Sequence, residues 1–227
     1  MSYGFLIEIY IERGVLMLKK TAVVVAGLLV AGVANAQWYG GVSIGASDLK
    51  NPGNDNVVAG ATAFSFSHDT TDTAYKLQAG YQINQHLAVE GGYVNLGKFK
   101  STESVTAPVV GTVSGNYKAH GWNIVAVGTL PLSQGFSAYG KLGTLYSTLK
   151  NDITTSGAVA LAAGASANRK RSEWNWAYGL GLQYDISKTI AVRGEWERYD
   201  RLGDNGGTNP TGQHNFDVYS VGLNFKF

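Results

Sequence analysis

The sequence predicts an all-β protein, more specifically an eight-stranded antiparallel up-and-down transmembrane β-barrel. Long segments alternate apolar and polar residues, which is the pattern of strands with two unlike faces. Most of these segments reach about 10 residues, the length that a tilted strand needs to cross a bilayer, whereas strands of soluble proteins average about 5–6 residues. Short and long connections alternate along the chain, which is typical of outer-membrane barrels. The 30 glycines and only 4 prolines also indicate many strands.

The first 36 residues do not share this pattern. Residues 17–36 have a basic start, an apolar stretch and the small-residue ending Ala-Asn-Ala, the three parts of a secretory signal peptide. We expect cleavage before Gln37. A membrane anchor is the alternative, but a spanning helix needs about 20 apolar residues and this stretch is shorter. Residues 1–16 are interpreted as an over-extended start, which leaves 37–227 as the barrel.

The first four expected strands lie near 38–46, 73–82, 86–96 and 114–130. The third shows the alternation residue by residue. Leu87 and Tyr93 share one face with other apolar residues, and Glu90 lies on the opposite face. The strand therefore has an apolar and a polar side.

The last four expected strands lie near 136–148, 171–184, 188–199 and 214–227. The fifth sets Lys141 against a face of aromatic and aliphatic residues. The sixth places Trp176 opposite Gln183, and the seventh places Trp196 opposite Arg193. The eighth carries a row of apolar side chains on one face: Tyr219, Val221, Leu223, Phe225 and Phe227.

The connections between these strands fall into two classes. Three are short turns, at 83–86, 130–135 and 185–189, and four are long loops rich in polar residues, at 47–72, 97–113, 149–170 and 200–213. Short and long connections alternate strictly, so all the long loops are expected at one end of the barrel. Outer-membrane barrels have this asymmetry, with tight periplasmic turns and long extracellular loops.

The bulky apolar face is expected to point toward lipid. The lumen of an eight-stranded barrel is only just wide enough for ordinary side chains, so large aromatic residues would not fit inside it. The polar residues and glycines then fill a polar interior. Aromatic residues near strand ends are expected to form girdles at the bilayer interfaces: Trp38, Tyr39, Tyr81, Phe136, Tyr184, Tyr199 and Phe227.

Composition excludes several functional classes. The net charge of +2 does not indicate nucleic-acid binding, and the absence of cysteine rules out disulfides and thiolate chemistry. The histidines are scattered without metal-ligand spacing. Ser43 lies in a G-x-S-x-G stretch, but no helix pattern follows it as a nucleophile elbow requires. We expect no catalytic, cofactor or metal site. A lipid-modifying enzyme stays open, because His120 and His214 fall near strand ends on the long-loop side.

Five short stretches resemble one family, and the likeness extends over essentially the whole chain after the signal peptide: "WYGG" (38–41), "AVEGGYVNLG" (88–97), "YKAHG" (117–121), "YGKLG" (139–143) and "VRGEWERY" (192–199). They resemble the eight-stranded membrane domain of the outer membrane protein A family. The resemblance implies a Gram-negative outer-membrane barrel. It also implies that the barrel-assembly machinery reads the apolar residues of the last strand as a signal. We expect the chain to lack the peptidoglycan-binding domain that follows the barrel in longer family members.

The family holds a charged cluster inside its barrel. The resemblance assigns to this cluster Glu90, Lys141, Arg193 and Glu195, and Glu197 points inward on the same strand. Because uncompensated buried charges are costly, we expect these five residues to form an interior network. The chain departs from the family at Val127 and Gln183, where the family has an inward lysine and glutamate. Exchange of ion pairs to open a slender channel is therefore not carried over.

A basic cluster opens the sixth strand on the long-loop side. Arg169, Lys170 and Arg171 are expected to contact phosphates of outer-leaflet lipopolysaccharide, because Arg and Lys favour phosphate, although a solvated loop is the alternative. The sequence thus predicts a monomeric outer-membrane protein with a structural, envelope-integrity and surface-display role. The alternatives are a narrow ion-conducting channel and, less favoured, the lipid-modifying enzyme.

Overall fold

The computed structural model describes residues 37–50, 62–159, 167–203 and 212–227. The expected signal peptide and over-extended start lie outside the described residues. Within the described part of the chain, no helix is long and apolar enough to cross a membrane. The strands, in chain order, are β1 (Gln37–Lys50), β2 (Ala63–Asp69), β3 (Thr71–Asn84), β4 (Leu87–Ala107), β5 (Gly111–Pro131), β6 (Phe136–Gly157), β7 (Asn168–Asp185), β8 (Ile190–Leu202) and β9 (His214–Lys226).

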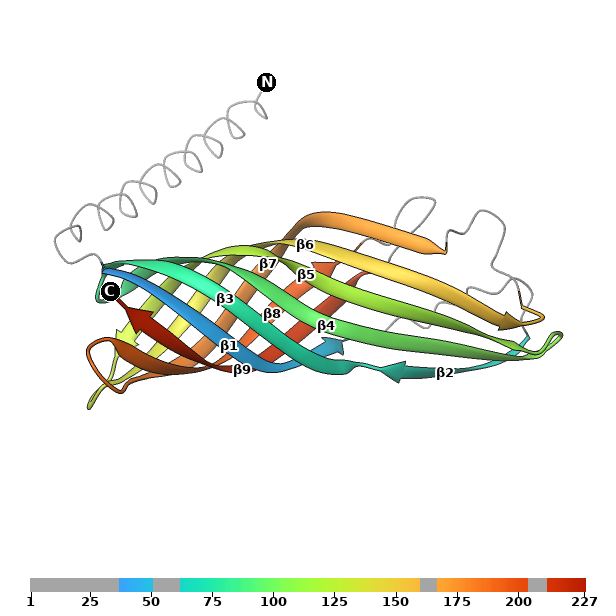
Figure 1. Cartoon of the computed structure of the whole chain (residues 1–227), viewed down its shortest axis with the longest axis horizontal. Helices are drawn as coiled ribbons and strands as arrows, with labels where there is room; N and C mark the ends of the chain where they lie inside the picture. The colour runs from blue at the N-terminus through green and yellow to red at the C-terminus, as the bar shows by residue number, and fades with distance from the viewer. Residues whose placement is uncertain (1–36, 51–61, 160–166, 204–211) are drawn as a thin grey trace, which may run out of the picture.

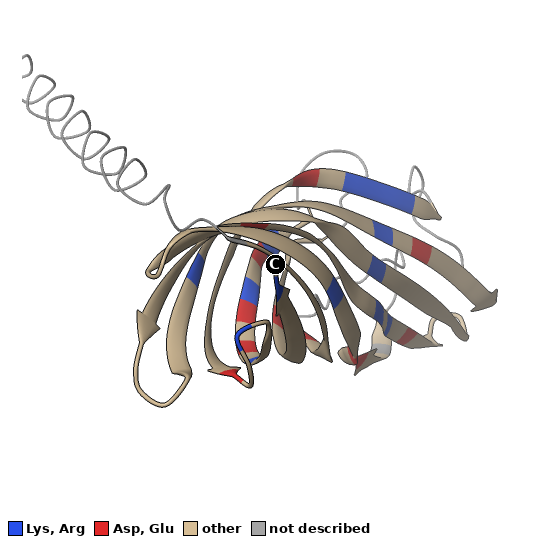
Figure 2. Cartoon of the chain, turned by 60° about the vertical axis from the view of Figure 1, so that its left-hand side comes forward, with Lys and Arg blue, Asp and Glu red and all other residues tan. Residues whose placement is uncertain are grey.

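These strands form one closed antiparallel sheet (Figures 1 and 2). β1 pairs with both β3 and β9, and β4 pairs with both β3 and β5, which closes the ring. β2 is separated from β3 by Thr70 and pairs with the outer part of β4. The predicted eight-stranded barrel is confirmed, with its second strand divided into β2 and β3. Closure leaves no open edge of backbone groups to face hydrocarbon, where they would find no partner.

The predicted orientation of the faces is confirmed by side-chain exposure. Trp176 is 55% exposed and Leu223 is 41% exposed, whereas Glu90 is only 3% exposed and Arg193 only 7%. In water this arrangement would leave apolar surface hydrated and charges buried. It is stable when hydrocarbon surrounds the barrel, as in a transmembrane barrel.

Aromatic residues line the outside of the barrel in cross-strand pairs. At the short-turn end, the ring centroids of Trp38 and Tyr81 lie 4.9 Å apart, and those of Phe136 and Tyr184 lie 4.6 Å apart. The prediction was wrong for two residues, however. Tyr39 and Tyr199 are 5% and 0% exposed, and their hydroxyl groups bind carboxylates inside the barrel.

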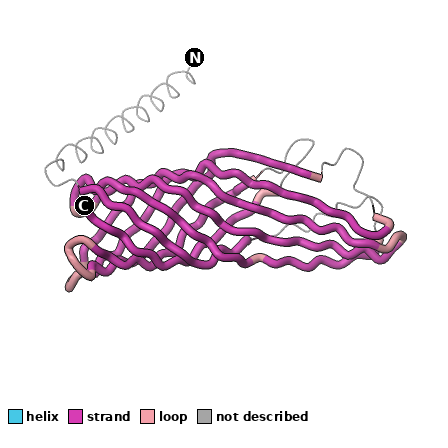
Figure 3. Tube along the Cα trace, in the orientation of Figure 1, coloured by secondary structure: helices cyan, strands magenta, loops and turns pink. Residues whose placement is uncertain are grey.

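The strands on the long-loop side are longer than predicted, as Figure 3 shows. β4 and β5 continue until only residues 108–110 separate them, and β6 runs to Gly157. The long loops predicted at 97–113 and 149–170 are therefore wrong over most of their length. The loop predicted at 47–72 is also largely strand, since β1 reaches Lys50, β2 covers Ala63–Asp69 and β3 begins at Thr71. At 200–213, β8 reaches Leu202.

Along these extensions the chemical character of the two faces is reversed, although in β6 residues of the same parity face the lumen throughout. In β6, Leu142 is exposed and Lys141 is buried near the middle of the barrel, but further along Lys150 is exposed and Leu149 is buried. Such a reversal is expected where a strand leaves hydrocarbon and enters water, since the apolar side chains then gain by turning inward. The barrel therefore projects beyond the membrane as a water-exposed β-structure.

A packed apolar layer fills this outer part of the barrel. Its members come from β1, β4, β6, β8 and β9 and are at most 5% exposed: Leu49, Leu96, Phe99, Leu145, Leu149, Leu202, Phe216 and Val218. The expectation of a polar interior thus holds for the membrane-embedded part and is wrong for the outer part. The lumen contains a polar layer and an apolar layer in series.

Candidate functional site: a charged layer in the lumen

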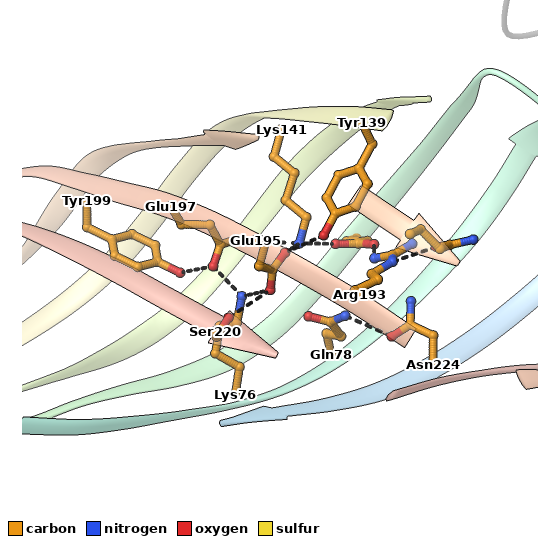
Figure 4. Close-up of polar contacts among 12 residues, drawn as sticks. Lys76, Gln78, Tyr139, Lys141, Arg193, Glu195, Glu197, Tyr199, Ser220 and Asn224 are labelled. Carbon is orange, nitrogen blue, oxygen red and sulfur yellow. Dashed lines mark hydrogen bonds and ion pairs between the residues drawn. The ribbon is translucent and has the colours of Figure 1, made fainter. Parts of the chain in front are cut away.

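Six charged side chains meet in the middle of the barrel (Figure 4). Three are basic and three are acidic, they come from β3, β4, β6 and β8, and each is between 3% and 7% exposed: Lys76, Lys141, Arg193, Glu90, Glu195 and Glu197. Three positive and three negative charges balance. Balance matters here because a buried charge without a partner costs several kcal/mol, on the order of 3–5.

Lys141 lies at the centre of this charged layer. Its Nζ is 2.7 Å from an oxygen of Glu195, 2.9 Å from Glu90 and 3.4 Å from Glu197. One ammonium group therefore contacts all three carboxylates. The structure places Lys141, Arg193 and the three predicted glutamates within one set of contacts.

Lys76 of β3 is a sixth member that the sequence reasoning missed. Its ammonium group forms ion pairs with both Glu195 and Glu197 of β8. The signal was present in the sequence, because Lys76 has the same parity as Ala74 and Gln78 within an expected strand. Assigning the faces of that strand would have placed it in the lumen.

Arg193 is held between two tyrosine rings. Its Cζ lies 5.2 Å from the ring centroid of Tyr39 and 4.9 Å from that of Tyr139. Its guanidinium group forms an ion pair with Glu90, and its Nε donates to Gln183 Oε1 at 2.7 Å. Gln183, where the resemblance implies a glutamate, therefore binds the arginine as a neutral acceptor.

Each of these tyrosines lies across a glycine of the neighbouring strand. Tyr39 is the register partner of Gly80, and Tyr139 is that of Gly181. A Cβ added at either glycine would lie 2.5 Å from the tyrosine hydroxyl oxygen. The missing side chains leave room for the rings, whose hydroxyls donate to Glu90 at 2.7 Å and to Glu195 at 3.0 Å.

This packing predicts opposite results for two glycine substitutions. We expect Gly181→Ala to destabilise the folded barrel by about 1–3 kcal/mol, because it overpacks the ring of Tyr139. We expect Gly194→Ala to be neutral or to stabilise by up to about 1 kcal/mol, since a Cβ there meets open space and alanine lowers the entropy of the unfolded chain. Urea titration in lipid vesicles measures both, and equal effects would contradict the proposed packing.

The charged layer lies at the inner end of a cavity. This cavity of about 210 Å³ opens at the short-turn end and is lined by Gln82, Thr129, Lys226 and other residues, reaching as far as Tyr39 and Arg193. Val127 also lines this cavity. The apolar layer lies beyond the charges. This arrangement can seal a barrel and fix the positions of its strands.

The other residues singled out in the sequence do not belong to the charged layer. Ser43 is buried within β1, so its stretch is not the strand-to-helix turn of a nucleophile elbow. Within the described ranges, no group of His, Cys, Asp or Glu is arranged to hold a metal ion. The five apolar residues of the last strand face outward, and Arg169, Lys170 and Arg171 lie at the outer end of β7. Lys170 and Arg171 are exposed, and Arg171 lies 3.6 Å from Glu173.

Comparison with known proteins found a matching family model, related sequences and a solved structure. The model of the OmpA-like transmembrane domain matches residues 33–227. Outer membrane protein P5 of Haemophilus influenzae is 27% identical over 82% of this chain and 52% of its own length. Outer membrane protein A of Yersinia pseudotuberculosis is 28% identical over 92% of this chain and 56% of its own length. This chain thus spans about half the length of these relatives. The crystal structure of OprG from Pseudomonas aeruginosa matches 85% of this chain and 95% of its own, with 18% identity and a TM-score of 0.47.

Proposed function

This chain belongs to the OmpA-like transmembrane domain family and is a β-barrel of the Gram-negative outer membrane, and we propose a structural role for it. In this proposal the barrel is closed, supports the envelope and displays rigid hairpins. The observation that carries this proposal is the double seal of the lumen. A balanced charged layer and a packed apolar layer lie one after the other along the barrel axis. Among the described residues, the charges of the first layer are paired with one another and the side chains of the second are at most 5% exposed, and we infer that this packing closes the lumen to steady ion flow.

The surface-display part of the proposal is supported by the extended strands. β4 and β5 project beyond the membrane as one hairpin, and β6 runs beside β5 up to its tip. A second apolar cluster holds the tips together: Val105, Val113, Ile153 and Val159. A stiff projection of this kind presents fixed surfaces to the outside, where partners are recognised with little loss of conformational entropy.

Two partners belong to the same proposal. The outward apolar row of β9 from Tyr219 to Phe225, together with Phe227 just after the strand, is proposed as the segment that the barrel-assembly machinery reads. The basic cluster at Arg169, Lys170 and Arg171 is proposed to contact lipopolysaccharide. Both proposals follow from placement on the outer wall and at the outer end of the barrel.

Conductance of the purified protein in planar bilayers tests the closed barrel. We expect no steady openings from the wild type at low or high salt, because both seals must rearrange before an ion passes. Steady openings that disappear in Glu90→Ala or Arg193→Ala would instead establish a channel and contradict the proposal. Permeability of a strain lacking the protein to a hydrophobic dye tests the envelope role, and we expect it to rise and to return to normal on complementation.

A further inference from the structure

Four lysines form one row across four neighbouring strands of the barrel wall. Lys98 of β4 is the register partner of Lys118 of β5, Lys118 is the partner of Lys150 of β6, and Lys150 is the partner of Lys170 of β7. All four side chains are exposed. Register partners in an antiparallel sheet share a face, with Cβ atoms about 5 Å apart. Figure 2 shows the basic bands of these strands beside one another on the projecting part of the barrel. We name these four residues the lysine row.

The lysine row is poorly compensated by the protein itself. Like charges directly opposite one another destabilise a sheet. Within the described ranges, only Lys118 of the row forms an ion pair, with Asp152 at 3.6 Å, and both side chains are about 45% exposed. On the other side of the barrel, outward charges are matched, since Arg198 makes two hydrogen bonds to Asp217 at 2.6 and 2.7 Å. The row therefore leaves a concentrated positive charge for an external anion.

The position of the lysine row along the barrel axis indicates which kind of anion it meets. Lys118, Lys150 and Lys170 each lie four residues beyond an exposed aromatic residue, namely Trp122, Tyr146 and Trp174. Four residues of a tilted strand rise about 10 Å along the barrel axis. Aromatic girdles mark the boundary between hydrocarbon and headgroups. The row thus stands at the level of the lipid headgroups in the outer leaflet.

We propose that the lysine row binds the phosphate groups of a phosphorylated outer-leaflet lipid, with diphosphoryl lipid A as its occupant. This inference rests on the lipopolysaccharide contact proposed above and moves its main site from the end of β7 to the outer wall of β4–β7. Parity separates the two sites, because only Lys170 of the basic cluster shares the outward face of the row. The girdle aromatics just below the row would contact the acyl chains while the ammonium groups bind the phosphates.

The test compares the wild type with a variant in which all four lysines are replaced by glutamine. Affinity for diphosphoryl lipid A in phosphatidylcholine vesicles is expected to fall several hundredfold, since each lysine near an anionic surface contributes roughly fivefold. In phosphatidylcholine alone, the glutamine variant is expected to resist urea as well as the wild type or better, because repulsion along the row is removed. This second measurement also shows that the variant folds.

Controls identify the source of any lipid effect. Replacing the four lysines by arginine keeps the charge and is expected to retain binding to lipid A. The wild type is expected to show no binding to dephosphorylated lipid A or to inorganic phosphate. Equal affinity of the wild type and the glutamine variant for diphosphoryl lipid A would overturn the proposal. No binding of diphosphoryl lipid A by the wild type would instead overturn the lipopolysaccharide contact itself, so failure of that contact and failure of the lysine row are distinguishable.

Discussion

Replacing Lys141 by glutamine is expected to destabilise the barrel by about 3–5 kcal/mol, because the substitution leaves an uncompensated negative charge among buried carboxylates. Lys141 is the group that contacts Glu90, Glu195 and Glu197 together. Glutamine is shorter and neutral, so the remaining cations, Lys76 and Arg193, face three acidic groups. Urea titration of the protein in lipid vesicles, read by tryptophan fluorescence and by heat-modifiability on gels, measures the loss.

A double variant separates charge balance from the loss of individual contacts. Lys141→Gln combined with Glu195→Gln leaves two positive and two negative charges in the layer. If balance is the dominant requirement, the double variant is more stable than Lys141→Gln alone, and the coupling energy between the sites exceeds about 1 kcal/mol. Simple addition of the two single losses would show that local contacts, and not balance, stabilise the layer. Lys188→Gln, at an exposed turn, serves as the control for removing one positive charge.

Replacing buried ion pairs by well-packed apolar residues is often neutral or stabilising in other proteins. The charged layer is therefore not explained by stability alone. Its geometry joins strands that are not neighbours: Lys76 on β3 contacts β8, and Lys141 on β6 contacts both β4 and β8. Contacts across the lumen specify which strands face one another, which the local pattern of each strand does not do.

The fold was predicted correctly from the sequence where the outer face of a strand contacts hydrocarbon along its whole length. Alternation with a period of two identified the strands, the lipid-facing row of β7 and five of the six charges in the lumen. It also placed the short turns together at one end. These features follow from a single rule, that hydrocarbon takes the apolar face, and the rule is local enough to read from neighbouring residues.

The same rule failed where the solvent changes along a strand. In β6, Leu149 and Ile153 are buried while Lys150 is exposed, which is the reverse of the phase around Leu142. A loop was predicted at 149–170 because the segment is rich in small and polar residues, and the reversed apolar phase was not used as a strand signal. A phase reversal within a continuous alternation is the sequence signal for a barrel that projects into water.

Whether an aromatic residue faces lipid or the lumen is predicted better by its parity within the strand than by its being aromatic. Tyr39 was assigned to the girdle because aromatic residues concentrate near bilayer interfaces. Its parity with Gly41 and Ser43 places it in the lumen, where its ring packs on Gly80 and its hydroxyl binds Glu90. The pairing of a tyrosine with a particular glycine depends on register between strands, which one strand's sequence does not contain.

The apolar layer is expected to be the second main source of stability. Phe216 of β9 is 0% exposed and its ring centroid lies 5.3 Å from that of Phe99 on β4. Phe216→Ala is therefore expected to cost about 3–5 kcal/mol, the sum of lost apolar transfer and of the cavity left behind. The matched control is Phe225→Ala on the same strand, which removes a ring that faces lipid and is 42% exposed. Lipid chains fill the space at Phe225, so only the transfer part is lost.

The difference in the free energy of unfolding between these two phenylalanine variants measures how tightly the outer part of the barrel is packed. Both lose the same atoms, so a larger cost for Phe216→Ala in urea titrations reports the enclosed cavity and hence a rigid core outside the membrane. Phe216→Ala is expected to show no channel openings in planar bilayers, because in the proposed closed barrel the charged layer still closes the lumen. An equal cost at the two positions would mean that the extended strands collapse freely around the gap. The projecting hairpins would then be too soft to present fixed surfaces to a partner.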